Sequence, residues 1–218
     1  MKVLVFGATG TAGGSVLRAC LQASDVEEVR AIVRRPLNFE HAKLKVFVHQ
    51  DYGNYALIKH AFLDVDACLF CLGISALQVP DEKAYRKITY DFSLAAAQML
   101  KEQSPHAAFH YISGQGTRLD SRQMWARVKG ETERDLMALG TATCWRPAFI
   151  DGGPSDHGPR IYRTLRPVAK LLKPFRSLYV SGEDLGRAML QAMKDDLRGR
   201  VIENPEIREL AGKGRQAK

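Results

Sequence analysis

Short apolar runs alternate with amphipathic stretches along most of the chain. The apolar runs predict buried strands at 3–6, 28–33, 44–49, 67–72, 107–112, 141–145 and 200–203. The intervening stretches repeat apolar side chains at helical spacing and predict helices at 11–21, 54–62, 81–101, 121–139 and 181–193. Such alternation is typical of a parallel sheet covered by helices on both faces. The pattern therefore predicts an α/β fold with a doubly wound, mainly parallel sheet.

The regular alternation breaks over residues 149–180. Residues 149–158 are rich in glycine, proline and aspartate and predict a loop at the carboxyl edge of the sheet, where ligands bind in such folds. We therefore expect residues 1–212 to form one domain, with a small substrate-side insertion at 149–180. Residues 213–218 are polar and predict a disordered tail. A chain of 218 residues is long enough for one substantial core.

A glycine-rich turn joins the first predicted strand to the first predicted helix. Its glycines Gly7, Gly10 and Gly13 would permit a tight turn, a close approach of backbone to a pyrophosphate and close packing of helix on strand. Phosphates would then lie against N–H groups at the helix N-terminus. We expect a dinucleotide to contact Gly7, Thr9, Gly10, Thr11, Ala12 and Gly13. The alternative is a structural turn without a ligand.

The residues after the second predicted strand indicate which dinucleotide would bind. An acidic residue there usually holds the ribose hydroxyls, whereas arginine accommodates a 2′-phosphate. This chain has Arg34 and Arg35, and the next acid is Glu40, so we expect NADP(H) in preference to NAD(H). The alternative is a solvated arginine pair at the start of a loop. Asp51 and Tyr52 follow the third strand where an adenine could lie, although aspartate is also a common turn former.

Composition narrows the class of protein without choosing a function. The formal net charge of +8 favours anionic ligands in general. Cys68 and Cys71 form a C-x-x-C, but a strand would point them to opposite faces, so we expect core packing and no metal. The first strand begins near Lys2, and no apolar run approaches the roughly 20 residues that span a bilayer. We therefore expect a cytoplasmic protein.

A basic amphipathic stretch occupies residues 160–176. Its cations recur every three or four residues at Arg160, Arg163, Arg166, Lys170, Lys173 and Arg176. Apolar side chains lie between them, and Pro167 would interrupt a helix. The pattern fits a solvated face over a core stripe, and it also fits contact with an anionic membrane or a nucleic acid.

Several motifs together allow a family to be named. They are Gly-Ala-Thr-Gly-Thr-Ala-Gly at 7–13, Arg34-Arg35, Cys71-Leu72-Gly73, Ser113, Lys129-Gly-Glu, Arg146-Pro147 and Glu183-Asp184. This set resembles the atypical short-chain dehydrogenase/reductases of the NAD(P)H-binding NmrA/epimerase-like group, above all the Tat-interacting-protein-like oxidoreductases. The resemblance covers roughly residues 2–205. It implies a Rossmann domain with a very small substrate region.

The resemblance also implies positions for the parts of the cofactor. The phosphates would lie on the glycine turn, the 2′-phosphate on the arginine pair and the adenine beside Asp51. Cofactor contacts would come from Leu72, Gly73, Lys129 and Pro147, with the nicotinamide near Gly73, Ser113 and Pro147.

The reductases of this superfamily use a serine, a tyrosine and a lysine four residues after the tyrosine. In that set the tyrosine transfers the proton, the lysine holds the ribose and the serine bonds the substrate oxygen. Ser113 and Lys129 match the pattern, but the tyrosine position holds Trp125. An indole N–H donates a hydrogen bond and has no usable protonation equilibrium. Ordinary carbonyl turnover is therefore in question.

Other groups could supply the missing proton. His157, in the loop over the site, titrates in a suitable range, although a plain surface histidine is an equal alternative. Tyr111 shares a strand face with Ser113 but is expected in the core. A desolvated Lys129 could itself donate. A flavin or quinone acceptor would depend less on a positioned tyrosine.

These observations support three hypotheses. The first is an NADPH-dependent reductase acting on an unidentified small carbonyl, quinone or flavin. The second is an NADPH-binding sensor with little or no turnover, favoured by Trp125. The third is an interaction protein that uses the basic stretch. Each is compatible with a monomer or a homodimer.

Overall fold

The computed structural model describes residues 1–151, 173–175 and 177–216, with side chains as far as residue 214. The strands of its main sheet run in the order β3-β2-β1-β4-β5-β6-β9, and every neighbouring pair is parallel. Their bounds are β1 (Lys2–Phe6), β2 (Glu28–Val33), β3 (Leu44–Val48), β4 (Ala67–Phe70), β5 (Ala108–Ile112), β6 (Ala142–Arg146) and β9 (Val201–Glu203). The first six follow the Rossmann strand order. The predicted α/β, doubly wound sheet is thus confirmed.

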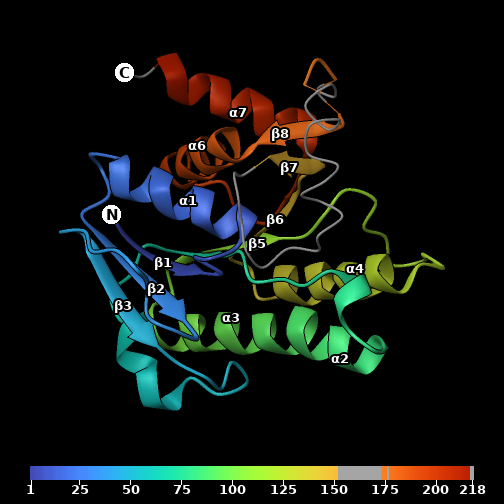
Figure 1. Ribbon diagram of the computed structural model, residues 1–218, viewed down its shortest axis with the longest axis horizontal. Coiled ribbons are helices and arrows are strands. Elements are labelled where there is room, and N and C mark those ends of the chain that lie inside the picture. Colours follow the sequence, from blue (N-terminus) through green and yellow to red (C-terminus); the bar gives the residue numbers. More distant parts are fainter. Residues whose placement is uncertain (152–172, 176, 217–218) are drawn as a thin grey trace.

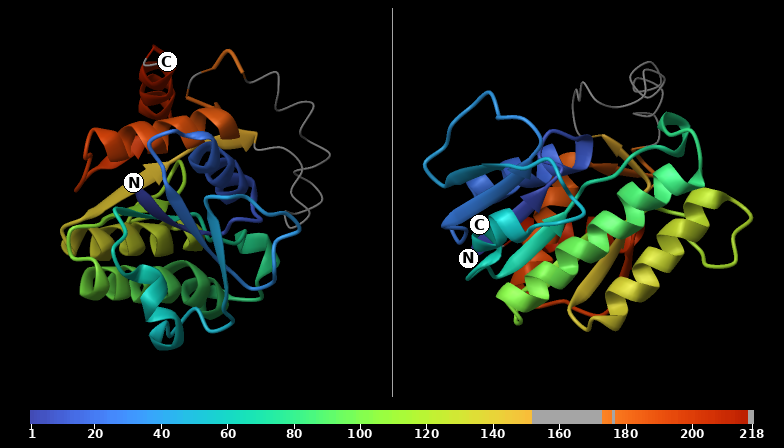
Figure 2. Two further views of the ribbon diagram at one scale, coloured as in Figure 1. Left: turned by 90° about the vertical axis from the view of Figure 1, so that its left-hand side faces the viewer. Right: turned by 90° about the horizontal axis from the view of Figure 1, so that it is seen from below.

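Helices cover both faces of this sheet (Figure 1). Their bounds are α1 (Thr11–Gln22), α2 (Glu82–Arg86), α3 (Phe92–Gln103), α4 (Met124–Ala138), α6 (Gly182–Lys194) and α7 (Asn204–Gln216). One face carries α1, α6 and α7, and the other carries α3 and α4, which run side by side (Figure 2).

The central strand β1 shows why both faces are covered. Successive side chains of a strand point to opposite faces. Val3 and Val5 belong to the apolar core beneath α1 and α6, whereas Leu4 and Phe6 belong to the core on the α3 side. All four side chains are fully buried. An unbroken apolar run of this kind is expected of a strand that has no solvent-facing side.

Two predicted helices contain tighter or wider turns. The predicted helix at 54–62 is a 3₁₀ helix, η1 (Ala56–Phe62), and the Asn54 side chain accepts a hydrogen bond from the N–H of Ala56 at 2.9 Å. The predicted helix at 81–101 contains a π-helical stretch, η3 (Lys87–Asp91), between α2 and α3. A further 3₁₀ turn, η2 (Ala76–Gln78), precedes α2.

The structure differs from the sequence prediction in two places near the C-terminal end. Part of the expected loop at 149–158 is a strand, β7 (Phe149–Asp151), which pairs in parallel with β8 (Tyr179–Ser181). Residues 213–216, expected in a disordered tail, belong to α7. Helix α7 buries Ile207 and Leu210, and this sparse apolar face is hidden among charged residues in the sequence.

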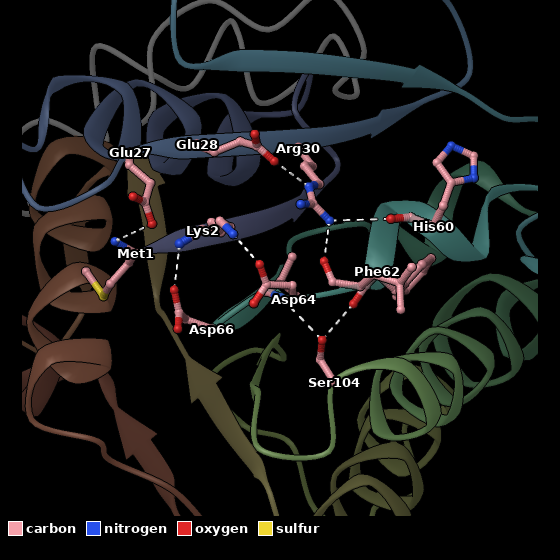
Figure 3. A network of polar contacts seen from close by, with 12 residues as sticks. Met1, Lys2, Glu27, Glu28, Arg30, His60, Phe62, Asp64, Asp66 and Ser104 are labelled. Carbon is pink, nitrogen blue, oxygen red and sulfur yellow. Dashed lines mark hydrogen bonds and ion pairs between the residues drawn. The ribbon is translucent and has the colours of Figure 1, made fainter.

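A network of polar contacts lies at the amino edge of the sheet, where the strands begin (Figure 3). Arg30 pairs with Glu28 at 2.6 Å and donates to the carbonyl oxygen of Leu63 at 2.6 Å. The Ser104 hydroxyl donates to the carbonyl oxygen of Phe62 at 2.9 Å. These contacts satisfy backbone groups where the chain enters β4 and β5. The carboxyl edge, where ligands bind in this fold, lies at the opposite end of the strands.

Candidate dinucleotide-binding site

Two glycines of the turn after β1 are required by close backbone contacts. Gly7 has φ of +73°, and a Cβ there would lie 2.6 Å from the carbonyl oxygen of Cys71 at the end of β4. A Cβ at Gly13 would lie 2.1 Å from the carbonyl oxygen of Gly7. The turn therefore lies directly against the end of β4, and α1 begins in close contact with the turn. The turn lies between β1 and β4, the two neighbouring strands at which the strand order of the sheet reverses.

Gly10 is different, because its surroundings are open. A Cβ at this position would approach only the carbonyl oxygen of Gly7, at 3.3 Å. Gly10 is the N-cap residue of α1, and the first turn of that helix holds no acidic side chain. A helix N-terminus of this kind presents N–H groups and the positive end of the helix dipole. These features fit a pyrophosphate at the turn, with the exposed Thr9 and the helix residues Thr11 and Ala12 beside it.

The arginine pair lies where the sequence analysis expects it. Arg34 and Arg35 directly follow β2, and both side chains are exposed. The side chain of Gln50 donates a hydrogen bond to the carbonyl oxygen of Arg34 at 2.6 Å, which holds the backbone of this bend. Both guanidinium groups are thus accessible to an anion at the carboxyl edge of the sheet.

The two residues expected near adenine have different environments. Asp51 is exposed, and its carboxylate accepts a hydrogen bond from the N–H of Gly53 at 3.0 Å, as in a common aspartate turn. Tyr52 is 4% exposed, and its ring packs against Phe6 in the core. Burial raises the pKa of the Tyr52 phenol to about 12. The structure places the ring of Tyr52 in the core, and a contact between Tyr52 and an adenine stays a prediction.

Residues at the ends of β4 and β6 border the same edge. Leu72 is half-buried, and Gly73 is exposed with open space where a Cβ would lie. Pro147 is buried, and its carbonyl oxygen accepts a hydrogen bond from the N–H of Gln115 at 3.0 Å. The end of β6 is thereby tied to the segment that follows β5.

Ser113, directly after β5, is buried, and its hydroxyl is engaged. Its Oγ lies 3.0 Å from Oγ1 of Thr117, which donates its own proton to the carbonyl oxygen of Gly114 at 2.8 Å. The Ser113 hydroxyl is therefore the donor to Thr117, and its lone pairs stay available to accept a hydrogen bond. Sequence analysis missed Thr117, since no spacing rule links this residue to the serine.

Lys129, on α4, lies beside Ser113. Its ammonium donates a hydrogen bond to the carbonyl oxygen of Ser113 and lies 6.0 Å from the centre of the Tyr111 ring. Burial lowers the pKa of Lys129 to about 8, and the negative charge of Glu133 opposes this shift. The structure thus brings the two matching residues of the reductase pattern together. At neutral pH this lysine carries a proton that it can release more readily than an ordinary lysine.

Trp125 and Tyr111 are placed less favourably for proton transfer than Lys129. Trp125 is half-buried on α4, and its Cη2 atom would lie 3.4 Å from a Cβ at Gly116, in the turn after Ser113. Tyr111 is 1% exposed and belongs to the core, and burial raises the pKa of its phenol. His157 lies outside the described residues, so its role stays a prediction.

The structure adds an ion pair that the sequence did not predict. Glu133 on α4 is 4% exposed, and its carboxylate binds the guanidinium of Arg146 at 3.0 and 2.6 Å. Arg146 also binds Glu203 on β9 at 2.9 Å. Glu133 stands four residues after Lys129, and this helical spacing could have indicated that Glu133 lies near Lys129, but not that it pairs with Arg146.

The basic stretch at 160–176 lies almost entirely outside the described residues. Its possible contact with an anionic membrane or a nucleic acid stays a prediction. In the part of the chain that the structure describes, no helix is long and apolar enough to cross a membrane.

A cavity of about 710 Å³ lies elsewhere in the molecule, along α1 and α6. Its lining includes Arg18, Asp25, Glu183, Arg187 and Lys194. Lys194 pairs with Asp25 at 2.8 Å across this cavity. None of the site residues predicted from the sequence lines it, so it is separate from the dinucleotide site.

Comparison with solved structures supports the fold. The enzyme WbmF from Bordetella bronchiseptica, solved in complex with NAD⁺, superposes with a TM-score of 0.72. It is 15% identical in sequence, and the match covers 99% of this chain and 77% of that one. A likeness at this identity shows a shared Rossmann-type α/β fold. The narrower resemblance to NmrA-like and Tat-interacting-protein-like proteins stays a prediction.

Comparison with curated sequences finds relatives that match nearly the whole length of this chain. No protein-family model matches the chain. "Protein FMP52, mitochondrial" of Eremothecium gossypii is 27% identical, over 96% of this chain and 97% of the relative. The protein of the same name from Kluyveromyces lactis is 30% identical, over 97% of this chain and 99% of the relative.

These names correct one expectation and give the family. The relatives are named as mitochondrial, which overturns the expectation of a cytoplasmic protein. The position of the first strand near Lys2 therefore did not determine the compartment. Given the near-complete match to the Kluyveromyces lactis protein, the chain belongs to the FMP52 family.

Proposed function

We propose that this protein is a mitochondrial oxidoreductase that binds NADPH and reduces a small carbonyl, quinone or flavin acceptor. The observation that supports this most directly is the glycine turn at the carboxyl edge of the Rossmann sheet. Ser113 directly follows β5 at this same edge, and the ammonium of Lys129 binds its carbonyl oxygen. NADP(H) in preference to NAD(H) follows from the exposed Arg34 and Arg35.

The residues of the chain would divide the work as follows. The N–H groups at the start of α1 would bind the pyrophosphate, and the arginine pair would bind the 2′-phosphate. The bound dinucleotide would supply a hydride to the acceptor carbon. Lys129 would hold the nicotinamide ribose, and Ser113 would contact the acceptor oxygen near Pro147. Ser113 must release Thr117 before its hydroxyl can donate to a carbonyl oxygen.

A proton must reach the acceptor oxygen as the hydride reaches carbon. Trp125 cannot supply it, because the indole nitrogen does not titrate. Lys129 has a pKa of about 8 and would donate from its ammonium, becoming a neutral amine that solvent reprotonates. Rates of carbonyl reduction should therefore fall as the pH rises through about 8, the pKa of Lys129. The test is the rate of NADPH oxidation at saturating cofactor, measured from about pH 6 to about pH 10, a range that spans the pKa of Lys129.

The test of cofactor binding compares two glycine variants. Gly10→Val would fill the space in front of α1 and should abolish binding of NADPH, measured by the change in its fluorescence on titration. Gly212→Val is the matched control, because a Cβ at Gly212 on α7 meets no atom within 4 Å. If Gly10→Val binds NADPH as tightly as Gly212→Val, the turn is structural and the proposal is wrong.

A second candidate function is an NADPH-binding sensor with little or no turnover. Trp125 in the tyrosine position and the engaged Ser113 hydroxyl favour it. A panel of aldehydes, ketones, quinones and flavins separates the two candidates. Tight NADPH binding without oxidation by any member of the panel would support the sensor and contradict the reductase.

A further inference from the structure

The ion pair between Glu133 and Arg146 lies one helical turn from Lys129. Glu133 is 4% exposed. Two nitrogens of Arg146 donate hydrogen bonds to the two carboxylate oxygens of Glu133, at 3.0 and 2.6 Å. A third nitrogen of Arg146 binds Glu203 at 2.9 Å. The guanidinium thus connects α4 with the last residues of β6 and β9.

The place of this pair gives it a role beyond stability. A buried ion pair contributes little net stability, because desolvation of the charges offsets their attraction. Arg146 immediately precedes Pro147, and the carbonyl oxygen of Trp145 accepts a hydrogen bond from the N–H of Ser113 at 2.7 Å. The pair therefore fixes α4 against the strand ends that border the dinucleotide site.

The pair also controls which partner Lys129 can take. A lysine and a glutamate four residues apart on a helix ordinarily attract each other. Here Arg146 occupies the carboxylate of Glu133, and the ammonium of Lys129 binds the carbonyl oxygen of Ser113 instead. Among the described residues, the Tyr111 ring on β5 also lies near Lys129, and the carboxylate of Glu203 on β9 is paired with Arg146.

We propose that the Glu133–Arg146 pair is a positioning device that keeps Lys129 away from Glu133 and directs its ammonium to the cofactor edge beside Ser113. This rests on the proposed function, in which Lys129 acts at the nicotinamide ribose. Without Arg146, the carboxylate of Glu133 would capture Lys129. The ammonium of Lys129 would then no longer lie beside the cofactor and the acceptor.

The test measures the titration of Lys129 directly, in protein without cofactor. Lysine is labelled with ¹³C at Cε, the Lys129 signal is assigned by its absence in Lys129→Met, and its shift is followed with pH by NMR. Arg146→Met should raise the pKa of Lys129 by about one unit or more, since an unpaired carboxylate favours the ammonium. The double variant Glu133→Gln/Arg146→Met should return the pKa to the wild-type value or below.

A matched control breaks a different ion pair of the same helix. Arg86 on α2 pairs with Glu131 on α4, so Arg86→Met removes a cation that is paired with α4 and leaves the contacts of Glu133 unchanged. It should leave the pKa of Lys129 unchanged. If Arg146→Met does not fold, the single variant Glu133→Gln is the remaining test. It should lower the pKa of Lys129, because it removes the neighbouring anion.

Two outcomes would overturn the positioning role. One is a folded Arg146→Met with the wild-type pKa at Lys129, and the other is a double variant with the same rise as the single one. NADPH titration of the same proteins keeps the two proposals apart. Wild-type protein that fails to bind NADPH contradicts the proposed function, while the pKa pattern still decides the role of Arg146.

Discussion

Arg34 and Arg35 are the side chains that would distinguish the two dinucleotides. Each can give a charge-assisted hydrogen bond to a 2′-phosphate, worth about 1.5–3 kcal/mol, or very roughly 10- to 150-fold in affinity. Wild-type protein should therefore bind NADPH more tightly than NADH. Arg34→Ala/Arg35→Ala should lose most of this preference, as measured by titration with both dinucleotides. Equal affinities in wild type would contradict the prediction.

The control for the Arg34 and Arg35 variant is a cation at the amino edge of the sheet. Lys101 on α3 donates a hydrogen bond to the carbonyl oxygen of Leu139 at 3.3 Å, just before β6 begins. Lys101→Ala also removes positive charge, but it should leave the preference for NADPH intact. A similar loss in this variant would show that overall charge, rather than the arginine pair, attracts the phosphate.

Trp125 allows a test of the proton step at one residue. If Lys129 transfers the proton less well than the tyrosine of the reductase pattern, carbonyl reduction by wild type should be slow, by up to about 10²–10⁴-fold. Trp125→Tyr should raise the rate, because the phenol would lie one helical turn from Lys129, and Lys129→Met in that background should remove the gain. Brisk turnover by wild type, with no change in Trp125→Tyr, would mean that a tyrosine is not needed, and the pH profile would then show whether Lys129 or another group such as His157 donates.

Individual residues of the site were predictable to different degrees. Gly7 and Gly13 followed from spacing, because their backbone contacts are local to one strand, one turn and one helix. The burial of Tyr52 could not be predicted, because it depends on packing against Phe6 of a different strand. Thr117 was missed because its hydrogen bond to Ser113 lies in an irregular segment, for which no spacing rule exists. The Arg146 partner of Glu133 was missed because hydrogen bonds between elements leave no pattern in the sequence.

Among the elements, the crossing of α1 and α6 depends on a glycine. A Cβ at Gly186 would lie 2.6 Å from the Cβ of Ala19 and 3.1 Å from the carbonyl oxygen of Ser15. Gly186→Ala should force the helices apart and lower the free energy of unfolding by about 1–3 kcal/mol, measured by urea denaturation. Gly212→Ala, on the open side of α7, should be neutral or stabilising by up to about 1 kcal/mol. Equal stability of both variants would contradict this packing.

The elements found from the sequence are those with a long or fully buried pattern. The six Rossmann strands and α1, α3, α4 and α6 each carry enough apolar positions to show their period. The strands β7, β8 and β9 span only three residues each, too few for a period to be recognised, and of these three only β9 was predicted. Helix α7 was missed because charged residues surround its buried face, which forms only by packing on α6.

At the scale of the whole molecule, the sheet holds a histidine that must stay neutral. His110 on β5 is fully buried, and its Nδ1 accepts a hydrogen bond from Nε1 of Trp145 at 3.2 Å. Its Nε2 has no hydrogen-bond partner among the described residues. Burial lowers the pKa of His110 to about 4. Protonation would place an unpaired charge between the central strands and the helix layer above them.

This gives a prediction for the acid stability of the protein. The folded pKa lies below the ordinary value of 6.5, so the unfolded chain binds the proton more readily, and stability falls as the pH drops from about 6.5 to about 4. The loss from this one group should be on the order of 3 kcal/mol. In His110→Leu the free energy of unfolding should be lower at pH 7, because Trp145 loses its acceptor, but it should decline less between pH 6.5 and 4. Urea denaturation of both proteins at a series of pH values measures the two slopes, and parallel slopes would show that carboxylates alone cause the acid sensitivity.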